Sequence, residues 1–209
     1  ERWSVRTLRA QVDGKLYERT LAASGGGITD LERELAALRE SGATPPALTF
    51  RDPHVLDFLG LPSEHSESDL EQAILDDMQR FLLELGAGFA FVGRQKRIAV
   101  DGEDYHLDLL FYHLGMRCYV AIELKTRKLK PGDKGQMELY CAWLDRYERS
   151  ELDAPTLGLI LCAVKGAEQV SLLGMDDGGI RAARYLTEPL RERMRARLAE
   201  TARGLTESG

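Results

Sequence analysis

Two acidic residues and a lysine, Asp108, Glu123 and Lys125, lie on neighbouring predicted strands and are expected to come close together. A two-residue turn at 115–116 places Asp108 directly opposite Glu123, and His106 opposite Lys125. Opposed side chains of an antiparallel pair lie about 5 Å apart. Two carboxylates so placed repel each other, and a shared proton or a divalent cation relieves the repulsion. The spacing therefore indicates a proton-sharing pair or a cation site.

An alternative interpretation is that Asp108, Glu123 and Lys125 simply face solvent, as charged residues on strands usually do. In the strand predicted over 117–126, the even-numbered positions form an apolar face and the odd-numbered positions, Glu123 and Lys125 among them, form the other. Apolar residues occupy both faces of the strand predicted over 105–112, which Asp108 interrupts. These apolar flanks, and the meeting of Asp, Glu and Lys, favour a site over a solvent-facing strand.

A third carboxylate, Glu71, lies in the helix predicted over 68–85. Ser68 and Glu71 have the spacing of a capping box, in which the Glu71 carboxylate would accept the backbone N–H of Ser68. The helical phase favours a site instead, because Glu71 lies within about 40° of the apolar stripe that includes Met78 and Leu82. Three other acids in or next to this helix are expected on the surface: Glu67, Asp76 and Asp77.

The helix predicted over 133–147 places Gln136 and Tyr140 on one face, with Trp143 one turn further along. A local explanation exists for each of them. Asp133 and Gln136 have capping-box spacing, and the two aromatic residues would also fit a core. Gln136 and Tyr140 therefore indicate a function only in combination with the carboxylates.

The elements that must position these residues form a predicted α/β core. Strands are expected at 89–100, 105–112, 117–126, 156–164 and 180–186, and helices at 68–85 and 133–147. Asp101-Gly102 is a hairpin signal, and a helical crossover favours a parallel fourth strand. The order αβββαβ gives a mixed central sheet flanked by helices.

Residues 1–44 precede this core as two short predicted helices, 3–22 and 30–40, and a linker. They are too small to bury a core alone, and we interpret them as the remnant of an N-terminal domain. The chain starts without Met, as if it were a segment of a longer protein. Residues 45–209 are expected to form the second domain, which ends in a helix from about residue 188.

The composition excludes several classes of protein. The 209 residues carry 28 Lys and Arg against 34 Asp and Glu, which gives a net charge of −6. This charge excludes a protein that coats nucleic acid with a basic surface, but it allows a local basic groove. No apolar run approaches the roughly 18 residues of a membrane helix. The three cysteines have no zinc or disulfide spacing. We expect free, buried thiols and a cytoplasmic location.

Asp108 followed by Glu123-Leu124-Lys125 on the adjacent strand resembles the PD-(D/E)xK phosphodiesterase superfamily, and Gln136 and Tyr140 resemble the Gln-xxx-Tyr motif of its RecB-like branch. A closer resemblance, to the YhcG-like family, covers nearly the whole chain. It rests on the segments DPHVLDFLGL, SESDLEQAILDDMQRFLLELG, FAFVGRQKR, LDLLFYH, AIELK and GQMELY. In that family a nuclease domain with a restriction-endonuclease-like fold follows an N-terminal domain of winged-helix type. One departure is Leu107, where the superfamily motif has Pro.

The resemblance implies a role for each matching residue. Asp108, Glu123 and the Leu124 carbonyl would bind Mg²⁺ or Mn²⁺, and Glu71 would complete the metal site directly or through water. Lys125 would orient or deprotonate the attacking water, or stabilise the developing charge. The remaining pair, Gln136 and Tyr140, would position the scissile phosphate or Lys125.

The function so implied is metal-dependent cleavage of DNA, in DNA processing or in defence against foreign DNA. Phosphate contacts are expected from basic residues near the site: Arg94, Lys96, Arg97, Lys128 and Lys130. Because Arg94 and Lys96 share strand parity, we expect at least one of them to face the cleft. Two alternatives stay open, namely a catalytically silent nucleic-acid-binding or assembly module on the same fold, and an RNase. A homodimer, and partner proteins bound through the N-terminal helices, are also left open; no membrane partner is expected.

Overall fold

A computed structural model describes residues 54–175 and 179–187. The predicted helices at 3–22 and 30–40, the boundary near residue 44 and the C-terminal helix from residue 188 lie outside the described residues. Across the described part of the chain, no helix is long and apolar enough to cross a membrane. Its three cysteines are free and buried, as predicted from their spacing.

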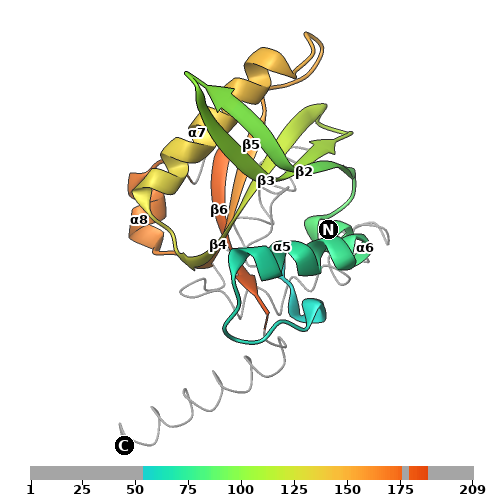
Figure 1. Ribbon diagram of the computed structural model, residues 1–209, viewed down its shortest axis with the longest axis vertical. Coiled ribbons are helices and arrows are strands. Elements are labelled where there is room, and N and C mark those ends of the chain that lie inside the picture. The colour runs from blue at the N-terminus through green and yellow to red at the C-terminus, as the bar shows by residue number, and fades with distance from the viewer. Residues whose placement is uncertain (1–53, 176–178, 188–209) are drawn as a thin grey trace, which may run out of the picture.

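One mixed sheet of six strands, in the order β1-β6-β5-β4-β3-β2, forms the centre of the fold (Figure 1). The strands are β1 (His54–Val55), β2 (Phe89–Val100), β3 (Glu103–His113), β4 (Cys118–Lys128), β5 (Leu157–Val164) and β6 (Ile180–Leu186). Strands β2, β3 and β4 form an antiparallel meander, and β5 pairs with β4 in parallel. The predicted αβββαβ order and the mixed, α/β character of the sheet are confirmed.

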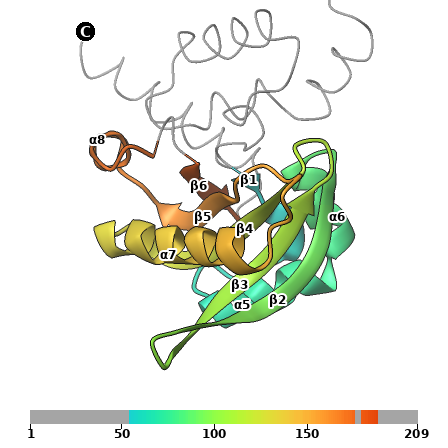
Figure 2. The same cartoon turned by 90° about the horizontal axis from the view of Figure 1, so that it is seen from above.

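Helices cover both faces of the sheet, with α5 (Glu67–Asp76) and α6 (Met78–Leu85) on one side and α7 (Pro131–Tyr147) on the other (Figure 2). Each face has its own hydrophobic cluster. Leu70, Ile74 and Phe81 pack in the first, and Met137, Tyr140 and Leu144 pack in the second, where α8 (Ala167–Leu172) joins them. Strand β5 contributes to both clusters, which explains its nearly continuous apolar sequence.

The helix predicted as one piece over 68–85 is two helices, and this prediction was wrong. The break falls at Asp77, whose φ of −121° and ψ of 44° are not helical. Aspartate has a low helix propensity because its side chain competes for backbone hydrogen bonds. Residues 54–59 form β1 and a short 3-10 helix, η1 (Asp57–Leu59).

The two turns of the meander fix how the site strands pair. Asp101 and Gly102 both have positive φ and form the predicted two-residue hairpin between β2 and β3. The connection from β3 to β4 has four residues, 114–117, and not the two expected. Its ends, His113 and Cys118, still pair with each other, so the predicted register holds from there to Leu109 opposite Ile122.

Candidate active site

The β3–β4 ladder ends one position before the predicted pair of acids. Beyond Leu109 and Ile122 the strands separate, and Asp108 replaces the missing backbone contact: its Oδ2 accepts the Leu124 N–H at 2.8 Å. Asp108 and Glu123 therefore flank the point where the strands part. His106 is not paired with Lys125 as expected, because the β3–β4 ladder ends before it. On its other side His106 pairs with Arg97 of β2, and its carbonyl accepts the Tyr140 hydroxyl at 3.2 Å.

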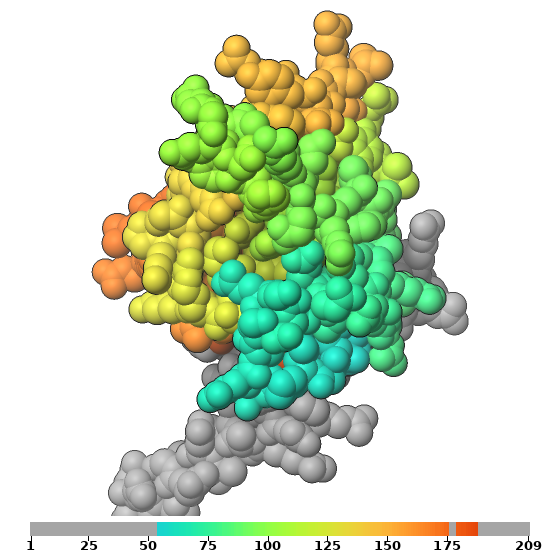
Figure 3. Space-filling view, in the orientation of Figure 1, coloured from blue at the N-terminus to red at the C-terminus, as the bar shows by residue number. Residues whose placement is uncertain are grey.

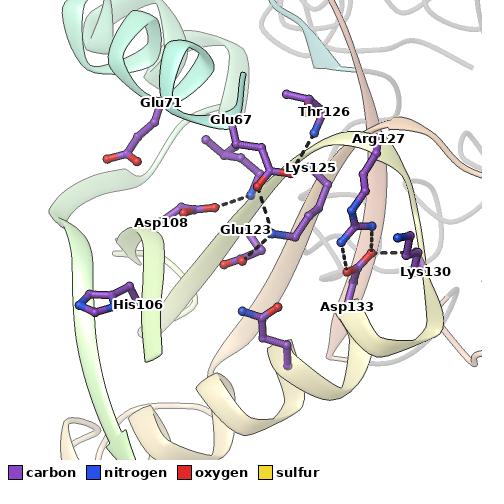
Figure 4. A network of polar contacts seen from close by, with 12 residues as sticks. Glu67, Glu71, His106, Asp108, Glu123, Lys125, Thr126, Arg127, Lys130 and Asp133 are labelled. Carbon is purple, nitrogen blue, oxygen red and sulfur yellow. Dashed lines mark hydrogen bonds and ion pairs between the residues drawn. The ribbon is translucent and has the colours of Figure 1, made fainter. Parts of the chain in front are cut away.

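Glu123 and Lys125 lie side by side in the interior, with only 3% and 8% of their surfaces exposed. The Lys125 Nζ is 2.9 Å from Glu123 Oε1, and the other carboxylate oxygen, Oε2, is buried without a hydrogen-bond partner. Figure 4 shows the Lys125 amine between the carboxylates of Glu123 and of Glu67 on α5. The solvent-facing alternative does not apply to this pair, and a buried acceptor without a donor is costly unless something binds it.

Burial dominates the electrostatics of the pair. It raises the pKa of Glu123 to about 7, the nearby Asp108 charge adds to the rise, and Lys125 opposes it. Burial also raises the pKa of Asp108, against the effects of the Leu124 N–H and Lys125. Burial alone would lower the pKa of Lys125, but the charges of Glu123, Glu67 and Asp108 outweigh it and raise that pKa.

The raised pKa of Glu123 predicts how the stability of the metal-free protein depends on pH. Between pH 4.5 and about 7 the folded protein holds a proton that the unfolded chain has lost. The free energy of unfolding therefore falls as pH rises through this window. We expect denaturant titrations in EDTA to show this fall in the wild type and a smaller one in Glu123→Gln. Equal slopes in the two proteins would contradict the assignment.

Glu71 is not the capping residue of α5. The N-cap is Ser66, whose hydroxyl accepts the Asp69 N–H while the Asp69 carboxylate accepts the Ser66 N–H at 2.9 Å. The capping explanation for Glu71 is thus wrong. Its Oε2 instead accepts the side-chain amide of Gln95, on β2, at 2.6 Å.

For Glu71→Gln we expect an unchanged metal-free melting temperature, because the cap is elsewhere, but metal binding that is weaker by about 10-fold or more. Single-turnover cleavage in saturating Mg²⁺ should also fall. The measurement is calorimetric titration with Mn²⁺ next to a rate measurement, with Asp69→Asn as the matched control that alters the cap and leaves the metal site intact. Wild-type metal affinity and rate in Glu71→Gln would remove Glu71 from the site.

Sequence reasoning missed two residues of the site, Glu67 and Gln95. Glu67 was expected on the surface, yet its carboxylate is 3.5 Å from Lys125 Nζ and accepts the Thr126 N–H at 3.3 Å. A signal for it existed, since Glu67 and Glu71 are four residues apart and share a helix face. The Gln95 amide bridges Glu71 and Asp108, at 2.6 and 3.1 Å. No spacing rule points to this glutamine.

The Gln136–Tyr140 pair lies beside the carboxylates and joins α7 to β3. The capping explanation for Gln136 is wrong, because Asp133 is the third residue of α7 and accepts the N–H of Lys130 at 2.7 Å. The Gln136 amide donates to the Tyr140 hydroxyl, which donates to the His106 carbonyl. Lys125 donates to Glu123 and lies 3.5 Å from Glu67, and in the part of the chain that the structure describes it donates to neither Gln136 nor Tyr140.

The basic residues proposed for phosphate contact lie in different environments. Arg94 is exposed and donates weakly to Gln72 of α5, at 3.4 Å. Lys96 instead pairs with Glu148 at 2.6 Å and lies over the Trp143 ring. Arg94 and Lys96 therefore lie on different sides of β2, although their strand parity predicted the same side. Arg97 pairs with Asp104 near the hairpin tip. The last two, Lys128 and Lys130, are exposed at the end of β4 and just before α7.

The side chains present fit a divalent cation that keeps part of its water shell. Among residues 54–175 and 179–187, no three His, Cys, Asp or Glu side chains converge into a complete cage. Asp108 and Glu123 could supply two carboxylates, one with a buried unpartnered oxygen, and the Leu124 carbonyl could supply a third ligand. Mg²⁺ is held by few carboxylates and several waters. Figure 3 shows that the surfaces of α5 and α7 adjoin on one face of the molecule.

The chain belongs to the family described as the YhcG PDDEXK nuclease domain, whose model matches residues 47–199. It is 36% identical over 212 residues to the Escherichia coli (strain K12) protein named "Putative nuclease YhcG", covering 98% of this chain. The chain spans 54% of the length of that relative. The fold is thus that of a nuclease domain family.

Two solved structures have a related arrangement of elements. A repair endonuclease from Pyrococcus abyssi is 21% identical with a TM-score of 0.43, covering 60% of this chain and 49% of that one. The structure of EndoMS in its apo form is 19% identical with a TM-score of 0.41, covering 60% and 48%. These likenesses concern the fold only.

Proposed function

We propose that this protein is a metal-dependent nuclease that hydrolyses phosphodiester bonds of DNA at the site around Asp108, Glu123 and Lys125. The observation that carries the proposal is the buried Glu123 carboxylate, which has one oxygen on Lys125 and the other without a partner. A buried carboxylate of this kind is unfavourable in a purely structural role. It becomes favourable when a cation occupies the unpartnered side.

Each residue of the site has a distinct role in this proposal. A divalent cation, when bound, supplies a Lewis acid and a water of lowered pKa. Asp108, Glu123 and the Leu124 carbonyl would hold it, and Glu71 would hold one of its waters. Lys125, fixed by Glu123 and Glu67, would place its positive charge against the phosphate oxygens. A phosphodiester reacts through a transition state that gathers negative charge, so this contact favours the transition state over the substrate.

The roles of Gln136 and Tyr140 in this proposal are structural support for the site. Tyr140 is fully buried, which is unsuited to contact with a phosphate. Its hydroxyl fixes the β3 backbone at His106, two residues before Asp108. We propose that the pair maintains the separation of β3 from β4 that the metal site requires.

DNA is the proposed substrate, with a role in DNA processing or in defence against foreign DNA, in the cytoplasm. The experiment that decides the substrate class presents the full chain with supercoiled, linear, single-stranded and branched DNA, and with RNA, in Mg²⁺, Mn²⁺ or EDTA. We expect metal-dependent cleavage of at least one DNA. Cleavage of RNA alone would establish an RNase, and binding without cleavage of any substrate would establish a silent binding module.

Arg94 is the basic residue best placed for a phosphate contact, because no acidic side chain among the described residues neutralises it and it lies beside α5. We expect Arg94→Ala to weaken DNA binding by roughly 3–10-fold at 0.1 M salt and to lower the log–log salt slope by about one. Fluorescence anisotropy at several salt concentrations measures both quantities. Arg80→Ala, which removes the same charge from α6, is the control, and an identical slope in the two variants would exclude the contact.

A further inference from the structure

Gln95 holds two carboxylates of the proposed metal site with one amide group. Its Nε2 is 2.6 Å from Glu71 Oε2, on α5, and 3.1 Å from Asp108 Oδ1, on β3. Ionised carboxylates only accept hydrogen bonds, so the amide must present its NH₂ group, with two donors, to both of them. The contact is neutral, and it brings the two acids together without a positive charge that would compete with a cation.

The Asp108 carboxylate is consequently held at both oxygens. Oδ2 accepts the Leu124 N–H at 2.8 Å, and Oδ1 accepts from Gln95. Two donors on different strands define the plane of this carboxylate. Outer contacts of this kind orient metal ligands, and their loss typically weakens metal binding by about 10–100-fold.

The backbone of Gln95 is in a conformation that glutamine rarely adopts. Its φ is 46°, in the left-handed region. The other two non-glycine residues of the described chain with positive φ, Asp101 and Arg117, lie in turns, whereas Gln95 lies within β2. Strained backbone inside a regular strand persists only where the surroundings enforce it, and such positions cluster at functional sites.

The strain interrupts the sheet at the point where the site begins. Arg94 pairs with Leu109 and Lys96 pairs with Leu107, while no pairing joins Gln95 to Asp108 between them. Leu109 packs on the α5 side of the sheet and Leu107 on the α7 side, although residues two apart in a regular strand share a face. The irregularity frees both the Gln95 and the Asp108 side chains to turn toward the site.

We infer that Gln95 is a positioning residue of the metal site, whose amide holds Glu71 and Asp108 in place. Its left-handed backbone conformation directs the amide toward these two carboxylates. The inference rests on the proposed metal-dependent function. It predicts that the amide and the backbone conformation have separable effects. Loss of the amide lowers metal affinity, and relief of the backbone raises stability.

Two substitutions at the same position separate these effects. Gln95→Ala removes the amide and keeps the strain, whereas Gln95→Gly removes the amide and tolerates the positive φ. We expect calorimetric titration of the metal-free full chain with Mn²⁺ to show about 10–100-fold weaker binding in both variants. We expect Gln95→Gly to melt about 2–4 °C above Gln95→Ala in EDTA.

Ala99→Gly is the matched control, since it places a glycine at an exposed position of the same strand where φ is not positive. It should lower the melting temperature and leave Mn²⁺ affinity unchanged. Wild-type affinity in both Gln95 variants would overturn the positioning role, and equal melting temperatures would overturn the strain argument. Failure of the wild-type chain itself to bind Mn²⁺ would instead contradict the proposed metal dependence.

Discussion

Replacing Lys125 by methionine is expected to lower single-turnover cleavage by about 10³-fold, or about 4 kcal/mol of transition-state stabilisation. Methionine preserves the packing of the buried stem and removes only the charge next to Glu123. Metal binding should survive, because lysine is not a ligand. The rate is measured with enzyme in excess over labelled DNA at saturating Mg²⁺.

Lys134→Met provides the control for this change. Lys134 lies in the first turn of α7 and pairs with Glu138 at 2.6 Å. We expect the Lys134→Met variant to cleave DNA at the wild-type rate. A Lys125→Met rate within about threefold of the control would mean that Lys125 only neutralises the buried acids.

Asp108→Asn is expected to remove both metal binding and cleavage while keeping the fold. The amide oxygen can still accept the Leu124 N–H, but the charge that attracts the cation is lost. Mn²⁺ affinity should fall by at least about 100-fold, more than for most changes to residues that only contact a metal ligand. Because burial raises the pKa of Asp108, the neutral side chain is favoured in the fold, and the variant should melt at or above the wild-type temperature in EDTA.

Thermal unfolding with and without metal separates these two effects. At a free metal concentration of about a hundred times the dissociation constant, wild type should gain about 2.7 kcal/mol, and Asp108→Asn should gain almost nothing. Asp104→Asn, an exposed change on the same strand, should respond to metal as the wild type does. An equal response in Asp108→Asn would place the cation elsewhere.

Patterns with a fixed period were readable from the sequence. The alternation along 118–124 gives the correct faces of β4, and the signal at Asp101-Gly102 gives the correct β2–β3 hairpin. The register expected from a turn at 115–116 is correct from His113–Cys118 to Leu109–Ile122, even though the connection has four residues and not two. The nearly continuous apolar sequence of β5 corresponds to its burial on both faces of the sheet. These features depend on local geometry and on burial, which the residue types encode directly.

The ends of the helices and the irregular backbone at Gln95 were harder to predict from the sequence. The capping boxes of α5 and α7 lie two and three residues earlier than suspected, and they are formed by Ser66 with Asp69 and by Lys130 with Asp133. Several polar residues in a row offer equivalent caps, and tertiary contacts decide among them. The role of Gln95 could not be predicted, because no sequence pattern marks a glutamine that adopts a positive φ within a strand. Its cause is the contact with Glu71 and Asp108, 24 and 13 residues away.

The most direct test of the central claim, a metal-dependent phosphodiesterase at Asp108, Glu123 and Lys125, is the single-turnover cleavage of DNA as Mg²⁺ is titrated into metal-free protein. Wild type and Asp108→Asn are prepared in parallel, so that a contaminating nuclease appears in both. We expect the wild-type rate to rise from zero in EDTA to a plateau in Mg²⁺, and no cleavage by Asp108→Asn at any concentration. Cleavage by wild type in EDTA, or equal cleavage by the two proteins, would contradict the claim.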